Sequence, residues 1–252
     1  MAINIILSGA CGKMGAAMAR IAAEKNGNVV FGADSFPKPL PFPVYKKLAD
    51  APNTANADVL IDFSHPSALP ELLDYAKSRG LPVVVATTGY SEMEIAEIKK
   101  ASEIVPVFFT FNMSLGINLL ADLARKAAEV LGADFDIEII EKHHNLKQDA
   151  PSGTALMLAD AIEPALNYAP RFIYDRHNMR RARKKEEIGI HSVRGGNIVG
   201  EHEIIFAGTD EVITLSHSAG SKEVFAVGAF RAAQYIAAKK GGNGLYTMKD
   251  LI

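Results

Sequence analysis

The sequence has only one cysteine, Cys11, so no disulfide can form within the chain, and a reducing compartment suits it. No apolar run approaches the roughly 18 residues that a membrane span requires. The start of the chain, a short apolar run at residues 3–7 followed by glycines, lacks the basic start and cleavage site of a signal peptide. We therefore expect a cytoplasmic protein with no membrane partner.

An excess of charge of either sign is also lacking, because 27 Lys and Arg nearly balance 29 Asp and Glu and leave a net charge of -2. Such a chain has no strong field to attract nucleic acid. The exception is a basic segment at residues 176–187, which lacks the interleaved aromatic residues that stack on bases. We interpret this segment as a solvated loop, with a subunit or substrate contact as the alternative, and expect no nucleic-acid partner.

The length of 252 residues suits two modest domains. The first 111 residues alternate between predicted strands (3–8, 28–33, 59–63, 82–86 and 105–110) and predicted helices (16–25, 66–79 and 92–102). This alternation predicts an α/β domain with a Rossmann-like, doubly wound parallel sheet. Four prolines at alternate positions make residues 35–44 a loop.

The pattern changes after residue 114. A helix at 115–131, a strand at 135–142 and a helix at 152–163 precede three strands at 188–193, 200–207 and 212–218 that no helix separates. This order predicts an α+β domain with a mainly antiparallel open sheet. A last helix at 224–240 is expected to pack on the first domain, and residues 244–248 are expected to be a docking tail outside any sheet. We therefore predict a dinucleotide-binding domain (1–114 and 225–252) and a substrate-binding domain (115–224).

A glycine-rich turn joins the first strand to the first helix. It consists of Gly9, Ala10, Cys11, Gly12, Lys13, Met14 and Gly15 and has the spacing G-x-x-G-x-x-G. Glycines let the backbone approach a pyrophosphate, and the helix N-terminus offers free N–H groups. Asp34 ends the second strand about 20 residues later, where an acid accepts hydrogen bonds from a ribose and disfavours a 2′-phosphate. The alternatives are a structural turn and a loop-capping role for Asp34, and the choice between NADH and NADPH stays open.

The most informative segment spans residues 141–155. His143 and Lys147 are the clustered groups with acid–base capacity near neutral pH, as reduction of a C=C or C=N bond requires. Ser152, Gly153 and Thr154 begin a predicted helix and offer hydroxyl and N–H groups to an anion, with His144 adding positive charge. These residues predict a pocket for a small substrate with more than one carboxylate.

Other interpretations of this segment are weaker. Paired histidines with Glu141 and Asp149 could bind a metal, but adjacent histidines on an extended chain point opposite ways and Lys147 would repel a cation, so we expect none. A plain surface loop before a capped helix remains an alternative. Neither a Tyr-x-x-x-Lys pair nor a G-x-S-x-G nucleophile elbow occurs.

Residues 142–155, K-H-H-N-L-K-Q-D-A-P-S-G-T-A, resemble the signature of the 4-hydroxy-tetrahydrodipicolinate reductase (dihydrodipicolinate reductase) family of lysine biosynthesis. The resemblance extends over most of the chain. It includes the first glycine turn, D-F-S at 62–64, T-T-G at 87–89, N-M-S-L-G at 112–116, R-G-G at 194–196, G-E-H at 200–202 and G-L-Y at 244–246.

The resemblance implies NAD(P)H-dependent reduction of a cyclic dicarboxylate to tetrahydrodipicolinate in the diaminopimelate pathway. It implies that His143 donates or accepts a proton, that Lys147 is a second donor, and that His144, Ser152, Gly153 and Thr154 hold the carboxylates. The cofactor would lie along the glycine turn and along Asp34, Ala86, Thr87, Thr88, Thr110, Phe111, Asn112 and Met113. A homotetramer formed through the sheet of the second domain is also implied.

Two positions depart from the family pattern beside the expected nicotinamide. Ala86 stands where the family has glycine, and Thr110-Phe111 stand where small residues or proline are usual. Their extra methyl group and phenyl ring could change cofactor affinity. The alternative functions are a related amino-acid dehydrogenase on the same fold and a dinucleotide-sensing protein without catalysis.

Overall fold

A computed structural model describes residues 2–52, 56–132 and 134–252. The chain forms two compact units, one of Met1–Leu115 with Glu223–Ile252 and the other of Gly116–Lys222. The first contains a parallel sheet with helices on both faces, and the second a separate sheet with helices on one face. The predicted fold class is therefore confirmed.

The sheet of the first unit has the order β12-β6-β5-β4-β1-β2-β3, and all of its pairings are parallel. Its strands are β1 (Ile3–Ser8), β2 (Gly27–Ala33), β3 (Val44–Tyr45), β4 (Val59–Asp62), β5 (Val83–Val85), β6 (Pro106–Phe109) and β12 (Gly244–Tyr246). The order runs outward from β1 in both directions, so the topological switch point lies between β1 and β4. Ligands bind such sheets at the carboxyl ends of the strands near this point.

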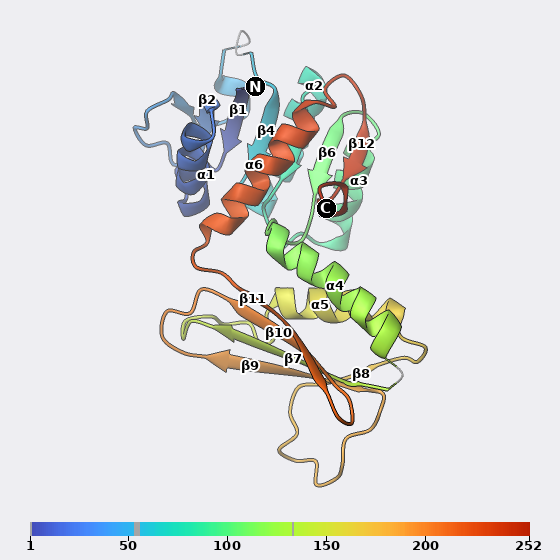
Figure 1. Ribbon diagram of the computed structural model, residues 1–252. Coiled ribbons are helices and arrows are strands. Elements are labelled where there is room, and N and C mark those ends of the chain that lie inside the picture. The colour runs from blue at the N-terminus through green and yellow to red at the C-terminus, as the bar shows by residue number, and fades with distance from the viewer. Residues whose placement is uncertain (1, 53–55, 133) are drawn as a thin grey trace. The chain divides into compact units, whose positions relative to one another are not determined.

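Helices cover both faces of this sheet (Figure 1). α1 (Lys13–Glu24) and α6 (Glu223–Ala237) pack on one face, and α2 (Leu69–Arg79) and α3 (Glu92–Ala101) pack on the other. α6 lies close to the backbone of Met113, since a Cβ added at Gly228 would be only 2.8 Å from the carbonyl carbon of Met113. Glycine at this position therefore allows the close contact. Short 3-10 helices occur at Leu48–Asp50, Pro66–Ala68 and Met248–Asp250.

The expectation that residues 244–248 lie outside any sheet was wrong. Gly244–Tyr246 form β12, which pairs in parallel with β6 and places Leu245 beside Val107. β12 thus covers the backbone donors and acceptors that β6 would otherwise expose along its edge. β3 is a further short strand, and it pairs with β2 just after the proline-rich loop.

The second unit contains a mixed five-stranded sheet of order β11-β10-β7-β9-β8. Its strands are β7 (Asp136–His143), β8 (Arg171–Ile173), β9 (Glu187–Arg194), β10 (Glu201–Ala207) and β11 (Val212–Ser218). β10 is antiparallel to β7 and β11, as expected from the sequence, whereas β9 runs parallel to both β7 and β8. The 43-residue connection from β7 to β9 contains α5 (Gly153–Ile162), which allows the parallel return.

α4 (Leu115–Leu131) and α5 pack on one face of this sheet and bury Leu120, Leu158, Ile139 and Phe206. Side chains along β7 alternate between this buried face and the other face. None of the helices in the described part of the chain is both long enough and apolar enough to cross a membrane.

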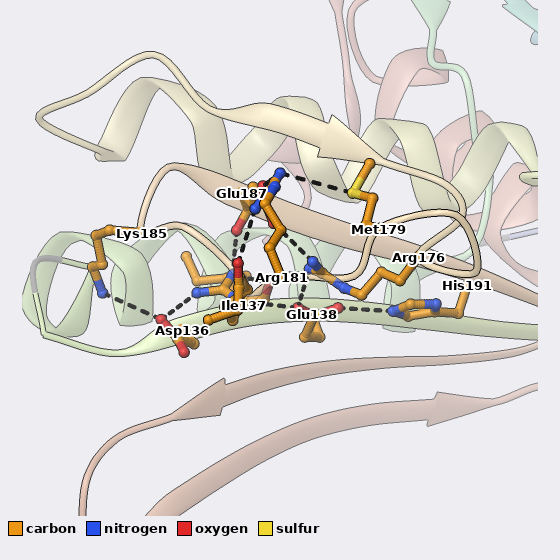
Figure 2. Close-up of polar contacts among 11 residues, drawn as sticks. Asp136, Ile137, Glu138, Arg176, Met179, Arg181, Lys185, Glu187 and His191 are labelled. Carbon is orange, nitrogen blue, oxygen red and sulfur yellow. Dashed lines mark hydrogen bonds and ion pairs between the residues drawn. The ribbon is translucent and has the colours of Figure 1, made fainter.

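The basic segment is a loop with six exposed residues, as expected, but four of its cations form ion pairs. Arg176 and Arg181 both pair with the buried carboxylate of Glu187, and Arg176 also reaches Glu138 on β7 (Figure 2). Lys185 extends toward Asp136 in the same view, and Arg183 forms an ion pair with Asp136. The hydrogen bonds from Arg176 and Arg181 lower the pKa of Glu187 to about 2. Acids on two strands therefore neutralise most of this basic segment.

Candidate active site

A cavity of about 320 Å³ lies at the carboxyl ends of β1 and β2, at the predicted dinucleotide turn. Gly9 and Gly12 line it, and Gly12 is the N-cap of α1. Gly9 has a φ of +74°, and a Cβ there would lie 2.6 Å from the carbonyl carbon of Phe63. The missing side chains open the helix N-terminus to the cavity, so the turn fits the pyrophosphate that the sequence predicts.

Asp34 faces this turn from the end of β2. Its Oδ2 accepts the backbone N–H of Cys11 at 2.9 Å, and its Oδ1 accepts that of Phe36 at 3.0 Å. It therefore caps the loop, yet each carboxylate oxygen keeps a second lone pair for a ribose hydroxyl. Lys46 and Lys47 line the same cavity and could meet a 2′-phosphate.

A second cavity of about 190 Å³ lies at the carboxyl ends of β5 and β6. It is lined by Thr87, Thr88, Gly89, Tyr90, Phe109, Thr110 and Phe111, so four predicted cofactor residues meet here. Phe111 is 68% exposed and packs edge-on against Phe109, with 5.4 Å between ring centroids. This side of the cavity is therefore aromatic.

Asp62, at the end of β4, anchors the neighbouring loop. Its buried carboxylate accepts hydrogen bonds from Thr87 Oγ1 and Ser64 Oγ, both at 2.6 Å. Burial raises the pKa of Asp62, and hydrogen bonds from Ser64, Thr87 and Ser8 partly oppose this rise. Asp62 thus holds the Thr87 side chain in place.

Four other predicted cofactor residues are buried and line neither cavity. Ala10, Ala86 and Met113 belong to the hydrophobic core of the first unit. Asn112 is also buried, and its Oδ1 accepts the backbone N–H of Ser114 at 2.8 Å. We assign these four side chains to shaping the backbone around the cavities.

In the second unit, His143 ends β7 and its side chain lies on the helix-covered face. Glu141, two residues earlier, lies on the same face, with its Oε2 2.6 Å from His143 Nδ1. Arg194 on β9 binds Glu141 with both guanidinium ends, at 2.7 and 2.8 Å. Burial alone would raise the pKa of Glu141, but hydrogen bonds from Arg194, His143 and Ser192 lower it to about 2.

Ser152, the N-cap of α5, joins the same cluster. Its backbone N–H donates to Glu141 Oε1 at 3.1 Å, and its hydroxyl accepts the N–H of Ala155. The hydroxyl also lies 3.2 Å from Nε2 of His202, whose ring centroid is 5.2 Å from that of His143. Burial lowers the pKa of His202 to about 4 and keeps its ring neutral at pH 7.

Lys147 forms an ion pair with Asp149, with 2.9 Å between Nζ and Oδ1. This pairing and the backbone N–H of Gly153 both contribute to lowering the pKa of Asp149. Arg194 also donates to the carbonyl oxygen of Asp149 at 2.7 Å. An internal carboxylate thus contacts Lys147 and the start of α5, two predicted partners of the substrate.

The two remaining predicted substrate residues flank this cluster. His144 follows β7 and is half-buried, and its Nδ1 has no hydrogen-bond partner among the described residues. Thr154 is half-buried in the first turn of α5. Within the described ranges, no group of three His, Cys, Asp or Glu side chains is arranged to hold a metal.

Arg194, His202 and Asp62 lie in motifs that carry the family resemblance but received no role from the sequence, and Glu141 was considered only as a metal ligand. One signal for Glu141 was available: residues two apart on a strand share a face, and Glu141 precedes His143 by two. Arg194 lies opposite His143 in the pairing of β7 with β9. That register is a property of the folded sheet.

Two family models match the sequence of this chain. The model of the dihydrodipicolinate reductase N-terminus matches residues 3–113, and that of the C-terminus matches residues 116–252. This chain belongs to the dihydrodipicolinate reductase family.

Full-length relatives agree. The 4-hydroxy-tetrahydrodipicolinate reductase of Caldanaerobacter subterraneus subsp. tengcongensis is 52% identical over 100% of this chain and 99% of that relative. The reductase of Clostridium novyi is 48% identical over 99% of this chain and 98% of that relative. The dipicolinate-bound dihydrodipicolinate reductase from Paenisporosarcina sp. TG-14 superposes with a TM-score of 0.83 at 25% identity, and the match covers all of both chains.

Membership of the family confirms the predicted enzyme class, an oxidoreductase that uses NADH or NADPH. The non-catalytic sensor that the sequence left open is thereby disfavoured, because the relatives carry the name of a reductase.

Proposed function

We propose that this family member reduces 4-hydroxy-tetrahydrodipicolinate to tetrahydrodipicolinate in the diaminopimelate route to lysine. The observation that carries the proposal is the cluster of His143, Glu141 and Ser152, which joins an acid–base group to the N-terminus of α5. Relatives of the same length carry the name of this reaction.

We assign cofactor binding to the first unit. The turn from Gly9 to Gly15 would hold the pyrophosphate, Asp34 the adenosine ribose, and the cavity of Thr87, Thr88, Thr110 and Phe111 the nicotinamide end. When bound, NADH or NADPH supplies the hydride. The free lone pairs of Asp34 favour NADH, whereas Lys46 and Lys47 favour NADPH, so we propose that both cofactors are used.

We assign substrate binding to the second unit. Ser152, Gly153 and Thr154 would bind one carboxylate at the N-terminus of α5, and His144 would help to hold the substrate. A carboxylate of the substrate would compete with Asp149 for Lys147 and for the N–H of Gly153. His143 would deliver the proton that balances the hydride, with Lys147 as the second donor.

The test is oxidation of NADH or NADPH at 340 nm, with substrate made in situ from pyruvate and aspartate semialdehyde. We expect turnover with both cofactors, and we expect His143→Gln to lower kcat by about 10²-fold or more, the usual scale for a lost proton donor. Absence of turnover by the wild-type protein with either cofactor would refute the proposed reaction. An unchanged kcat in His143→Gln would remove His143 from the mechanism.

We also propose a cytoplasmic homotetramer that assembles through the second sheet. The face of this sheet away from α4 and α5 carries half-buried Ile140 and Ile205 and exposed Val193 and Val212, which would be buried between subunits. Light scattering should give about four times the chain mass. A monomer at micromolar concentration would contradict the assembly.

A further inference from the structure

We propose that Glu141 is a positioning residue that orients both halves of the substrate site, the acid–base imidazole of His143 and the anion-binding N-terminus of α5. This inference rests on the proposed function for its catalytic meaning. Its geometry stands on contacts within the second unit alone.

Glu141 contacts His143 through a short hydrogen bond. An ionised carboxylate can only accept, so the 2.6 Å contact requires a proton on His143 Nδ1. In the neutral ring, Nε2 then carries the lone pair and takes up a proton from solvent, and the resulting imidazolium, stabilised by Glu141 at Nδ1, delivers that Nε2 proton to the substrate. Glu141 therefore selects one tautomer and fixes the direction in which Nε2 points, as carboxylates do for catalytic histidines.

The space around Nε2 fits this assignment. A Cβ at Gly200 would lie 3.1 Å from His143 Nε2, closer than ordinary van der Waals contact. Glycine at this position therefore leaves room beside Nε2. His202 packs edge-on against the same ring and restricts its rotation.

Glu141 also contacts the start of α5 through Ser152. The other oxygen of Glu141 accepts the Ser152 N–H at 3.1 Å, and Ser152 is the N-cap of α5. One carboxylate thus connects the ring of His143 to the first turn of α5. A shift of Glu141 would displace the proton donor and the carboxylate site together.

Arg194 keeps the buried carboxylate of Glu141 able to orient His143 and α5. Its bidentate ion pair keeps Glu141 ionised, because an uncompensated buried carboxylate would otherwise take up a proton. A neutral Glu141 could present a hydroxyl to Nδ1 and lose its selection of the tautomer.

The chain offers a matched control on the same strand. Glu138 on β7 accepts a hydrogen bond from Arg176 at 2.8 Å and lies 2.7 Å from Nε2 of His191, as Figure 2 shows. Each cluster pairs a β7 glutamate with an arginine and a histidine, and the two lie on opposite faces of β7. Glu138→Gln therefore removes a paired charge outside the substrate site, and because Glu138 lies beside Ile205 on the proposed subunit face, light scattering must show that this variant keeps the wild-type mass.

The decisive measurement is the ¹⁵N spectrum of histidine side chains in the wild-type protein, with the signal of His143 assigned by its loss in His143→Gln. At about pH 8 we expect His143 to carry its proton on Nδ1. A proton on Nε2 would overturn the proposal, whether or not the protein turns over substrate. This outcome therefore differs from failure of the proposed function, which is absence of wild-type turnover.

The variant Glu141→Gln tests whether the orientation of His143 and α5 by Glu141 matters for catalysis and for substrate binding. Its amide can donate to Nδ1, which favours the Nε2–H tautomer and excludes the imidazolium that would deliver the proton. We therefore expect a fall in kcat of at least about 10²-fold and weaker dipicolinate binding. The Kd for NADH should stay within about twofold, and Glu138→Gln should leave kcat and dipicolinate affinity within about twofold of wild type. A folded Glu141→Gln with wild-type kcat would refute the positioning role. If this variant fails to fold, the wild-type spectrum still decides.

Discussion

Gly15→Ala should show how tightly the cofactor turn is packed. Gly15 lies in the first turn of α1, where an added Cβ would overlap the carbonyl oxygen of Gly9 and lie 2.7 Å from that of Ala10. This distance is roughly 0.5–1 Å too short for ordinary contact. Overpacking of this kind costs about 1–3 kcal/mol.

This overpacking energy can reduce either the stability of the protein or its affinity for NADH. If the turn holds its shape, the strain lowers the thermal midpoint by about 2–4 °C for each kcal/mol. If the turn moves away from α1, its N–H groups leave the pyrophosphate site, and the same 1–3 kcal/mol raises the Kd for NADH about 5–150-fold. Scanning calorimetry and titration calorimetry with NADH measure the two effects separately.

Gly220→Ala is the control, since a Cβ at Gly220 meets no atom within 4 Å and its unfolding midpoint and Kd should match wild type. If Gly15→Ala shows neither a lower midpoint nor a weaker Kd, the close approach of α1 to the turn is not present in solution.

Three further predictions concern cofactor choice, charge and packing. Asp34→Asn should keep an acceptor for the turn but remove a charge beside Lys46 and Lys47, raising the ratio of kcat/KM for NADPH over NADH about tenfold; an unchanged ratio would exclude Asp34 from the choice. Glu187→Gln should lower the unfolding midpoint near pH 7, because ionised Glu187 pairs with two arginines. Its pKa, lowered from 4.5 to about 2, means that this stabilisation is full above about pH 4.5 and is lost as the pH falls through about 2, so the gap to wild type should close there in a thermal-melt series; a constant gap would contradict the pairing. Phe206→Ala, at a fully buried core position, should reduce stability by about 3–5 kcal/mol in urea titrations, and a loss below 1 kcal/mol would contradict the core packing.

The periodicity of the sequence predicted most of the elements, because long buried strands and amphipathic helices have clear local patterns. Pairing between distant segments has no such local signal. Gly244–Tyr246 is a three-residue strand that pairs with Pro106–Phe108. Its sequence is too short to show the alternation of a strand, so it was predicted to be a tail outside the sheet. The parallel pairing of β9 with β7 could not be predicted either, because the residue pattern of a strand does not indicate the direction of its neighbour.

In the candidate site, too, the residues that are close in the sequence could be predicted, and those brought together by the fold could not. His143, Lys147 and Ser152 could be predicted because they are neighbours in the chain. Arg194 comes from another strand and meets Glu141 only through the sheet register. The ion pairs of the basic segment could not be predicted for the same reason, because its acidic partners Asp136 and Glu138 precede it by about 40 residues.

The division of the first unit has a consequence for its synthesis on the ribosome. α6 supplies Ala229 and Phe230 to the core beside Ile5 and Leu7, yet it follows roughly 110 residues that form the second unit. At 5–20 residues per second, roughly 5–20 s pass between the synthesis of β6 and that of α6, which covers one face of the sheet together with α1. The second unit, being continuous, is free to fold during this interval. The nascent cofactor half therefore exposes apolar sheet surface for many seconds, a period in which chaperones or crowding by neighbouring ribosomes would determine its yield.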